Sequence, residues 1–244
     1  MGAEVSPGGS DLRARAASVL GRIERAARRT GRDPARVTLV AVSKTHPAAL
    51  VREAAEAAGL REFGENRVQE AESKTDALKE VPGLRWHLIG HLQPNKARRA
   101  VRLFDLVHTV DSAALLERLE RICVEEGRER LEVLAQVDLA GEATKSGATE
   151  SDLPALFEMF GHCTRVRCRG LMILPPFRED VEQVRPYFRR LRALRDEWGA
   201  RGAFGAGEGE LSMGMSHDYE TAVEEGATLV RVGTALFGAR ESVA

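Results

Sequence analysis

Lys44 combines a reactive side chain with a position where that side chain could do chemistry. It follows residues 37–42, the most apolar β-rich run of the sequence. A lysine that is partly desolvated at such a place has a lowered pKa, and its neutral amine can form a Schiff base with a carbonyl compound. Lysines also leave strands simply to reach solvent, so position alone leaves both interpretations open.

The segment Leu229-Val-Arg-Val-Gly-Thr-Ala-Leu-Phe-Gly238 is the second candidate. Gly233 and Thr234 follow its apolar residues, and backbone N–H groups at the start of a following helix bind phosphate readily. Because strand side chains alternate, Arg231 points to the face opposite to that of Val230 and Val232. Its guanidinium is always charged. A Gly-Thr pair can also simply end a strand. Together with an active lysine that binds a carbonyl group, however, the Gly233-Thr234 pair predicts a phosphorylated carbonyl ligand.

These residues need a scaffold that brings distant strand ends together. Eight strands are expected, nearly all joined by helical segments, and they start near residues 37, 61, 85, 106, 132, 167, 210 and 228. Strand–helix alternation implies parallel pairing, and eight repeats within roughly 210 residues fit a closed barrel. We therefore predict the α/β class and a single (β/α)8 TIM barrel. A doubly wound sheet is the alternative, but no glycine-rich dinucleotide turn follows the first strand.

An extra amphipathic helix precedes the first strand. Ser10 or Asp11 could cap it, Gly31 could stop it, and we expect it to pack across one face of the barrel. Residues 1–10 are expected to be a disordered tail, and residues 11–244 a single domain.

Composition excludes several classes of protein. Lys and Arg number 36 against 37 Asp and Glu, so no basic field favours nucleic acid or a membrane surface. Cys123, Cys163 and Cys168 contain no CxxC pair, which argues against disulfides or a zinc site and predicts reduced thiols. No apolar run approaches the ~20 residues of a membrane span, and no signal peptide is visible. We expect a cytoplasmic protein without a metal site.

Motifs spread over residues 41–240 occur in the order of a known family. They are Ala41-Val-Ser-Lys-Thr45, Phe63-Gly-Glu-Asn66, Gln69-Glu70, Trp86-His-Leu-Ile-Gly90, Leu92-Gln93, Asn95-Lys96, Lys145-Ser-Gly147, Arg169-Gly-Leu-Met172, Leu211-Ser-Met-Gly-Met-Ser216-His-Asp218, Val230-Arg-Val-Gly-Thr234 and Phe237-Gly-Ala-Arg240. Through them the sequence resembles the YggS/PROSC family of pyridoxal phosphate homeostasis proteins. That family has the barrel that also forms the N-terminal domain of alanine racemase, called fold type III.

The resemblance implies a cofactor, pyridoxal 5′-phosphate, and a role for each matching residue. Lys44 would carry the cofactor as an internal aldimine, and Asn66 would lie near its ring. Ser216, Gly233 and Thr234 would hold the phosphate; Ser212 is the rival serine, and the sequence does not separate the two. Arg231 aligns with the arginine that faces the pyridine nitrogen in alanine racemase.

The resemblance further implies a protein that holds pyridoxal phosphate reversibly and buffers or delivers it, without robust catalysis and as a monomer. Enzymes that need the cofactor would be its partners. The alternative is a racemase-like enzyme, and a more distant one is an aldolase that uses Lys44 on a sugar phosphate. A guanidinium accepts no proton, so a ring nitrogen facing Arg231 stays unprotonated and the ring is a weaker electron sink.

Other polar residues have ordinary interpretations. Alanine racemase takes its second base, a tyrosine, from an additional β domain; this sequence ends six residues after Gly238, so we expect no such domain. Tyr219 is the one tyrosine worth testing as a base, and no catalytic residue is assigned. His87 is expected in the core or at the mouth of the barrel. The basic cluster at residues 95–102 is expected to be a solvated face, with an anionic partner as the alternative.

Overall fold

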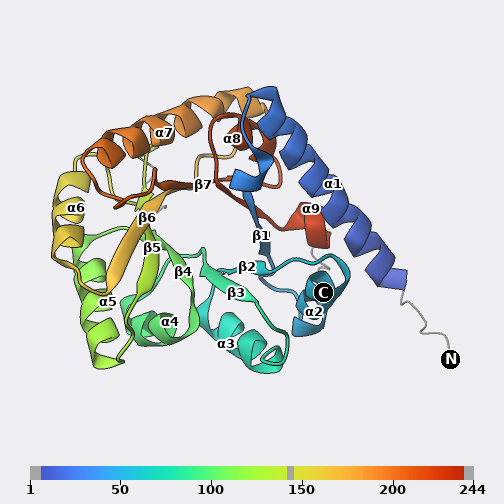
Figure 1. Cartoon of the computed structure of the whole chain (residues 1–244), viewed down its shortest axis with the longest axis horizontal. Helices are drawn as coiled ribbons and strands as arrows, with labels where there is room; N and C mark the ends of the chain where they lie inside the picture. The colour runs from blue at the N-terminus through green and yellow to red at the C-terminus, as the bar shows by residue number, and fades with distance from the viewer. Residues whose placement is uncertain (1–6, 142–145, 239–244) are drawn as a thin grey trace.

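Eight parallel strands form one closed barrel in the order β1 to β8, with helices outside it (Figure 1). The computed structural model describes residues 7–141 and 146–238. The strands are Thr38–Val42 (β1), Glu62–Glu65 (β2), Arg85–Leu88 (β3), Leu106–Val110 (β4), Leu131–Val137 (β5), Val166–Ile173 (β6), Glu210–Met215 (β7) and Leu229–Val232 (β8). Each strand begins within one residue of the position that the sequence predicted, and the predicted (β/α)8 barrel is confirmed.

Helices cover the outside of the barrel. They are Ala48–Ala57 (α2), Val68–Ala77 (α3), Ala97–Leu103 (α4), Ala113–Glu125 (α5), Leu153–His162 (α6), Arg185–Ala200 (α7), Tyr219–Glu224 (α8) and Thr234–Phe237 (α9), with short 3-10 turns at Pro34–Arg36, Pro94–Lys96 and Val181–Gln183. In α5, buried residues such as Leu115, Leu119 and Ile122 recur at helical spacing, and Ser112 caps the first turn by accepting a hydrogen bond from the Leu115 N–H. Among the described helices none is long and apolar enough to cross a membrane.

Alternate strand residues face the barrel interior, where an apolar layer forms. Val40, Leu106, Leu134, Met172 and Leu229 pack together there, away from the larger core between strands and helices. Their neighbours along the strands point outward under the helices, as strand alternation requires. Because only every second residue of a strand points inward, few side chains share the barrel interior.

The N-terminal helix α1, Pro7–Arg29, lies along the outer wall between α8 and α2 and also contacts α9 (Figure 1). It begins before Ser10 and Asp11, so neither residue is the cap that the sequence suggested. Of the expected tail, residues 7–10 are helical and residues 1–6 lie outside the described part of the chain. Leu12, Val19 and Ile23 are buried against the barrel's outer layer.

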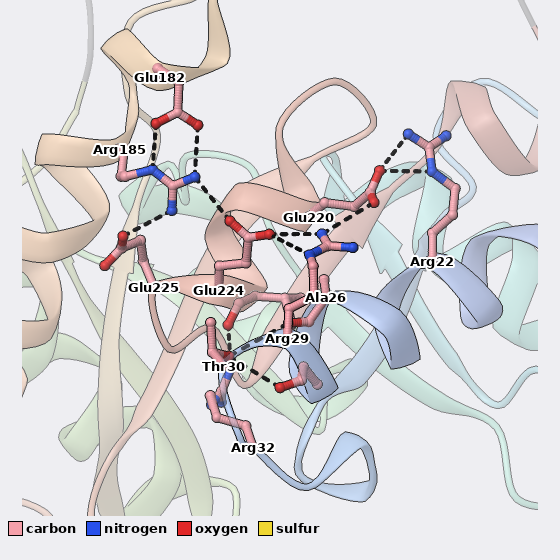
Figure 2. A network of polar contacts seen from close by, with 12 residues as sticks. Arg22, Ala26, Arg29, Thr30, Arg32, Glu182, Arg185, Glu220, Glu224 and Glu225 are labelled. Atoms are coloured by element: carbon pink, nitrogen blue, oxygen red, sulfur yellow. Dashed lines mark hydrogen bonds and ion pairs between the residues drawn. The ribbon is translucent and has the colours of Figure 1, made fainter.

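Arginines fasten α1 and the turn after it to α8 (Figure 2). Arg29 pairs with both Glu220 and Glu224, and Arg22 pairs with Glu220. Arg32 donates to the carbonyl oxygens of Val223, Gly226 and Ala227, which close the end of α8. Exposed ion pairs contribute little individually, whereas three bonds from one half-buried guanidinium fix the orientation of the turn.

Candidate functional site

A cavity of about 470 Å³ lies at the carboxyl end of the barrel. Its lining includes every residue to which the sequence analysis assigned a binding role: Lys44, Asn66, Ser216, Arg231, Gly233 and Thr234. They come from the ends of four strands, because the carboxyl ends of all parallel strands meet at one end of a barrel. The volume lies within the range of small-molecule and cofactor sites. The placement of these residues is therefore as predicted, and their roles stay predictions.

Lys44 is held in place by the residues on either side of it. Its neighbour Ser43 is buried and donates from Oγ to Glu65 Oε1 over 2.6 Å. On the other side, the Thr45 N–H donates to Glu70 Oε2 over 3.0 Å. Thr45 has a φ of 67°, a left-handed conformation that is uncommon for residues other than glycine. The turn that presents Lys44 to the cavity is thus fixed by contacts from β2 and α3 rather than by its own preference.

A buried ion pair supports the same turn from outside the barrel. Lys74 Nζ donates to the Ser43 carbonyl oxygen over 2.7 Å and to Glu65 Oε1 over 2.5 Å. Burial raises the pKa of Glu65, and the bonds from Lys74 and Ser43 oppose that rise. Glu65 Oε2 has no hydrogen-bond partner among the described atoms. This carboxyl therefore depends on Lys74 for its charge compensation.

Arg231 reaches the cavity from the barrel interior and is only 3% exposed. Its Nη1 donates to Ser212 Oγ over 2.6 Å, and its Nη2 donates to the Ile173 carbonyl oxygen over 2.8 Å. Burial lowers the pKa of Arg231 to about 10, and the charge of Asp218 opposes that effect. The guanidinium therefore remains protonated at neutral pH and offers only donors to the cavity.

Backbone donors gather at one corner of the cavity. The N–H groups of Gly233 and Ala235 both point at Ser216 Oγ, at 3.2 and 3.4 Å. Thr234 begins α9 between them and is exposed. Ser212, by contrast, is fully buried below the cavity, where it bonds to Arg231 and to a histidine. The geometry thus places Ser216, and not Ser212, with the donors suited to an anion.

Asn66 follows β2 and packs against the end of β3. A Cβ atom on Gly90 would lie 2.3 Å from the Asn66 carbonyl oxygen, so only glycine permits this approach. The cavity wall also contains residues that the sequence analysis did not assign, among them Ile89, Leu174 and Phe177. Phe177 is 70% exposed and lies beside the His217 ring. Apolar residues carry no chemical signal in a sequence, which explains why they were missed.

The remaining candidates lie elsewhere. Tyr219 is buried on α8 beneath α1, with the Arg22 guanidinium 5.4 Å from its ring centre, so it is not placed as a base for the cavity. His87 is buried inside the barrel, as expected of a core histidine. In the basic cluster, Arg98 pairs with Glu125 and Glu126 at the end of α5, and Arg102 pairs with Glu126, so this is a solvated, ion-paired face.

Three motif residues, Lys145, Ala239 and Arg240, lie outside the described residues. The three cysteines are buried free thiols, and burial raises the pKa of Cys123 to about 11 and that of Cys163 and Cys168 to about 12. Within residues 7–141 and 146–238, no cluster of three or more His, Cys, Asp or Glu side chains is arranged to hold a metal ion.

Known proteins resemble this chain along nearly all of its length. The family described as alanine racemase, N-terminal domain, matches residues 18–241. A pyridoxal phosphate homeostasis protein of Pseudomonas aeruginosa is 48% identical over 225 residues, which are 92% of this chain and 94% of that protein. The structure of PipY from Synechococcus elongatus, solved with PLP (pyridoxal phosphate) bound, is 44% identical with a TM-score of 0.79 and matches 93% of this chain and 100% of that one. Alanine racemase from Streptomyces coelicolor shares the fold at 20% identity, with a TM-score of 0.70, over 95% of this chain and 59% of its own.

We expect Lys74→Met to lower the free energy of unfolding at neutral pH by about 3–5 kcal/mol, because it leaves the Glu65 carboxyl buried without a cation. Burial already raises the pKa of Glu65 in the folded state, and without Lys74 to oppose that effect the pKa rises further above its unfolded value. The loss should therefore be smallest at acidic pH and grow as the pH rises through the folded-state pKa. Urea unfolding across pH measures both effects. Lys79→Met, at an exposed lysine of the same region, is the control, and equal stability of both variants would contradict the prediction.

Proposed function

The chain belongs to the family of pyridoxal phosphate homeostasis proteins, and from that premise we propose that its cavity holds pyridoxal 5′-phosphate on Lys44. The observation that carries the proposal is the convergence of a lysine amine, a buried guanidinium and paired backbone donors on one cavity. In the cell the protein would buffer the cofactor and deliver it to enzymes that need it. We propose a monomer as its working unit.

The residues present fit the chemical parts of this cofactor. When bound, it supplies an aldehyde that condenses with a primary amine, next to an electron-withdrawing ring. Lys44 supplies the amine at the end of β1. Ile89, Leu174 and Met215 supply apolar wall for a flat ring, and Asn66 offers polar groups at its edge.

Ser216, Gly233 and Thr234 are proposed to bind the phosphate. The Gly233 and Ala235 N–H groups already converge on one oxygen, Ser216 Oγ, which is the arrangement that an anion needs. Thr234 adds a hydroxyl donor at the exposed side of the same corner. Because several neutral donors share the anion, no lysine is required there, and Lys44 is left for the aldehyde.

Arg231 is proposed to face the ring nitrogen. Its two bonds to Ser212 and Ile173 fix the guanidinium, which can only donate a hydrogen bond and so leaves the nitrogen without a proton of its own. A ring in that state stabilises negative charge poorly. Both tyrosines are described, and neither lines the cavity as a second base. These features favour holding the cofactor over turning over amino acids.

A racemase-like enzyme is the second candidate, and the fold shared with alanine racemases favours it. The two proposals differ in what happens to an added amino acid. A racemase must remove and return the α-proton with groups on both sides of the ring, whereas a carrier needs neither group.

Lys44→Ala should abolish covalent attachment of the cofactor while the protein stays folded, because a half-exposed residue past the end of β1 contributes little packing. The measurement is borohydride reduction of the loaded protein followed by peptide mass mapping. Lys79→Ala, at an exposed lysine on the outer surface, should retain the reduced adduct at Lys44. An adduct that persists in Lys44→Ala would place the attachment elsewhere.

Thr234→Val should weaken binding of pyridoxal phosphate by several-fold to about a hundredfold, the effect of losing one hydrogen bond to a neutral or charged acceptor. Unphosphorylated pyridoxal should lose much less affinity, because it lacks the group that Thr234 contacts. Fluorescence titration with both compounds gives the two ratios. Equal losses would remove Thr234 from the phosphate corner.

The wild-type protein loaded with cofactor should exchange the α-proton of added alanine in heavy water far more slowly than about 1 per second, an ordinary enzymatic rate. The physical reason is the combination of an unprotonated ring and the absence of both tyrosines from the described lining of the cavity. Proton NMR of alanine follows the exchange, and free cofactor at the same concentration is the control. Turnover at ordinary enzymatic rates would replace the carrier with the enzyme.

A further inference from the structure

A line of hydrogen-bonded side chains runs through the barrel interior from the cavity toward the opposite end. Arg231 Nη1 bonds to Ser212 Oγ over 2.6 Å, and Ser212 Oγ lies 2.8 Å from His108 Nδ1. His108 Nε2 lies 2.8 Å from His87 Nδ1, and His87 Nε2 lies 2.5 Å from Glu62 Oε2. These five residues, called the polar row below, come from β8, β7, β4, β3 and β2.

The polar row is enclosed except at its far end. Ser212, His108 and His87 are at most 1% exposed, while the Glu62 side chain is 20% exposed. The cavity chemistry proposed above uses only Arg231 of these five. Three buried polar residues with no contact to the cavity therefore need another reason to occupy space that an apolar layer would otherwise fill.

The chemistry of the two end groups gives the row a direction. A guanidinium can only donate, and an ionised carboxylate can only accept. One assignment of hydrogens satisfies every contact: Arg231 donates to Ser212, the Ser212 hydroxyl donates to His108 Nδ1, His108 Nε2–H donates to His87 Nδ1, and His87 Nε2–H donates to Glu62. Both imidazoles are then neutral and carry their hydrogen on Nε2.

The reverse direction leaves contacts unsatisfied. If His108 donated from Nδ1 to Ser212, its Nε2 would need a hydrogen from His87 Nδ1. A neutral His87 would then present an unprotonated Nε2 to the Glu62 carboxylate, and two acceptors would face each other. A doubly protonated His87 would satisfy Glu62. The Ser212 hydroxyl hydrogen would then have no acceptor, because both bonded neighbours of Ser212 donate to it. The assigned direction is therefore the stable one while Glu62 is ionised.

The charges around the row agree with that direction. Burial, with the nearby charge of Arg231, holds the pKa of His108 well below its ordinary value, so this imidazole is neutral. Burial by itself would raise the pKa of Glu62, but the hydrogen bond from His87, together with Arg85, holds it below its ordinary value. Glu62 is thus an acceptor throughout the neutral range.

Other charged groups at the far end compensate one another. Glu62 Oε1 accepts from Arg85 Nη1 over 3.2 Å, and Arg85 also lies 3.9 Å from Glu132. Arg130 and Arg169 approach that same Glu132. At the cavity end, Asp218 is the acidic group whose charge acts on the guanidinium of the row.

We propose that Ser212, His108, His87 and Glu62 are positioning residues for Arg231, a one-directional hydrogen-bonded row that orients the guanidinium toward the bound cofactor. The row does this because hydrogen bonds that all point one way, between a cation and an anion, polarise and strengthen one another. This inference rests on the proposed function for the identity of the ligand, whereas the direction of the row is a property of the protein alone.

The first experiment tests the direction without any cofactor. Long-range nitrogen–proton NMR spectra of the cofactor-free, ¹⁵N-histidine-labelled protein report which ring nitrogen carries the hydrogen. We expect His108 and His87 as neutral Nε2–H tautomers at about pH 7, with His108 unchanged between about pH 6 and pH 8. Assignment comes from comparing His108→Gln and His87→Gln. A neutral Nδ1–H tautomer at His108, or titration of His108 in that range, would overturn the proposal.

The second experiment tests the effect on the cavity. Glu62→Gln keeps the size of the side chain but introduces an N–H donor, so the direction of the row is no longer fixed. We expect the His108 tautomer signal to shift or split, the absorption band of the bound cofactor to move, and cofactor affinity to fall about two- to tenfold. Glu132→Gln is the matched control, since it also contacts Arg85 but is not hydrogen-bonded to His87, and it should leave all three readouts unchanged.

Ser212→Ala breaks the row next to Arg231 and leaves the guanidinium its bond to Ile173. The cofactor band should move in this variant as in Glu62→Gln. An unmoved band in both variants, with the cofactor still attached to Lys44, would overturn the positioning role. Failure of the wild-type protein to hold the cofactor at Lys44 would refute the proposed function instead, and the tautomer measurement would still decide the direction of the row.

Discussion

The pairing of β1 with β8 is the constraint on which the site depends. In this pairing Val40 lies opposite Arg231 and Ala41 lies opposite Val232. Lys44 follows β1 and Gly233 follows β8, so the closure alone brings an amine and a group of backbone N–H donors from distant parts of the sequence to one cavity. The contact is tight: a Cβ atom on Gly233 would lie 3.2 Å from the Val42 carbonyl oxygen. A barrel closed in another register would separate the two functional segments.

The helix that covers the outside of the β1–β8 pairing is α1, which precedes β1. In a regular strand–helix repeat, a helix that follows β8 would take this position. Between β8 and residue 238, where the described chain ends, the structure contains the four-residue α9, and α1 occupies the outer position between α8 and α2 (Figure 1). Because α1 supplies the buried apolar surface, the segment after β8 is free to serve the cavity. Its backbone N–H groups turn toward Ser216 instead of continuing into a long helix.

The sequence predicted the barrel well because its strands are short apolar runs bounded by Gly, Pro and charged residues. The rule that sites gather at strand ends then found Lys44, Arg231 and Gly233. It could not choose between Ser212 and Ser216, because both are hydroxyl residues close to the end of the same strand, Ser212 within β7 and Ser216 just past it. What separates them is depth in the barrel, which depends on the stagger of the strands and on the irregular register between β7 and β8.

Tertiary packing decided the features that local patterns could not. Tyr219 follows the Ser216 loop directly, yet the first turn of α8 carries its ring outward beneath α1. The start of α1 at Pro7 was also missed, because Ser10 and Asp11 are typical caps and only the surrounding structure shows that the helix passes through them. Glu62, His87 and His108 have no common spacing, so their contact could be seen only in the folded barrel.

A buried charge in the cavity wall constrains the core beneath it. A guanidinium that is 3% exposed must have partners for its donors, and the apolar layer of the barrel interior, which includes Val40, Leu134 and Met172, offers none from its side chains. Ser212 meets part of that need, but its hydroxyl then needs an acceptor in turn, and each further buried group transfers the same demand to the next. The demand ends only where a charged acceptor reaches the edge of the barrel, which is what Glu62 does. The hydrogen-bonded side chains beneath the cavity therefore reach the opposite end of the barrel.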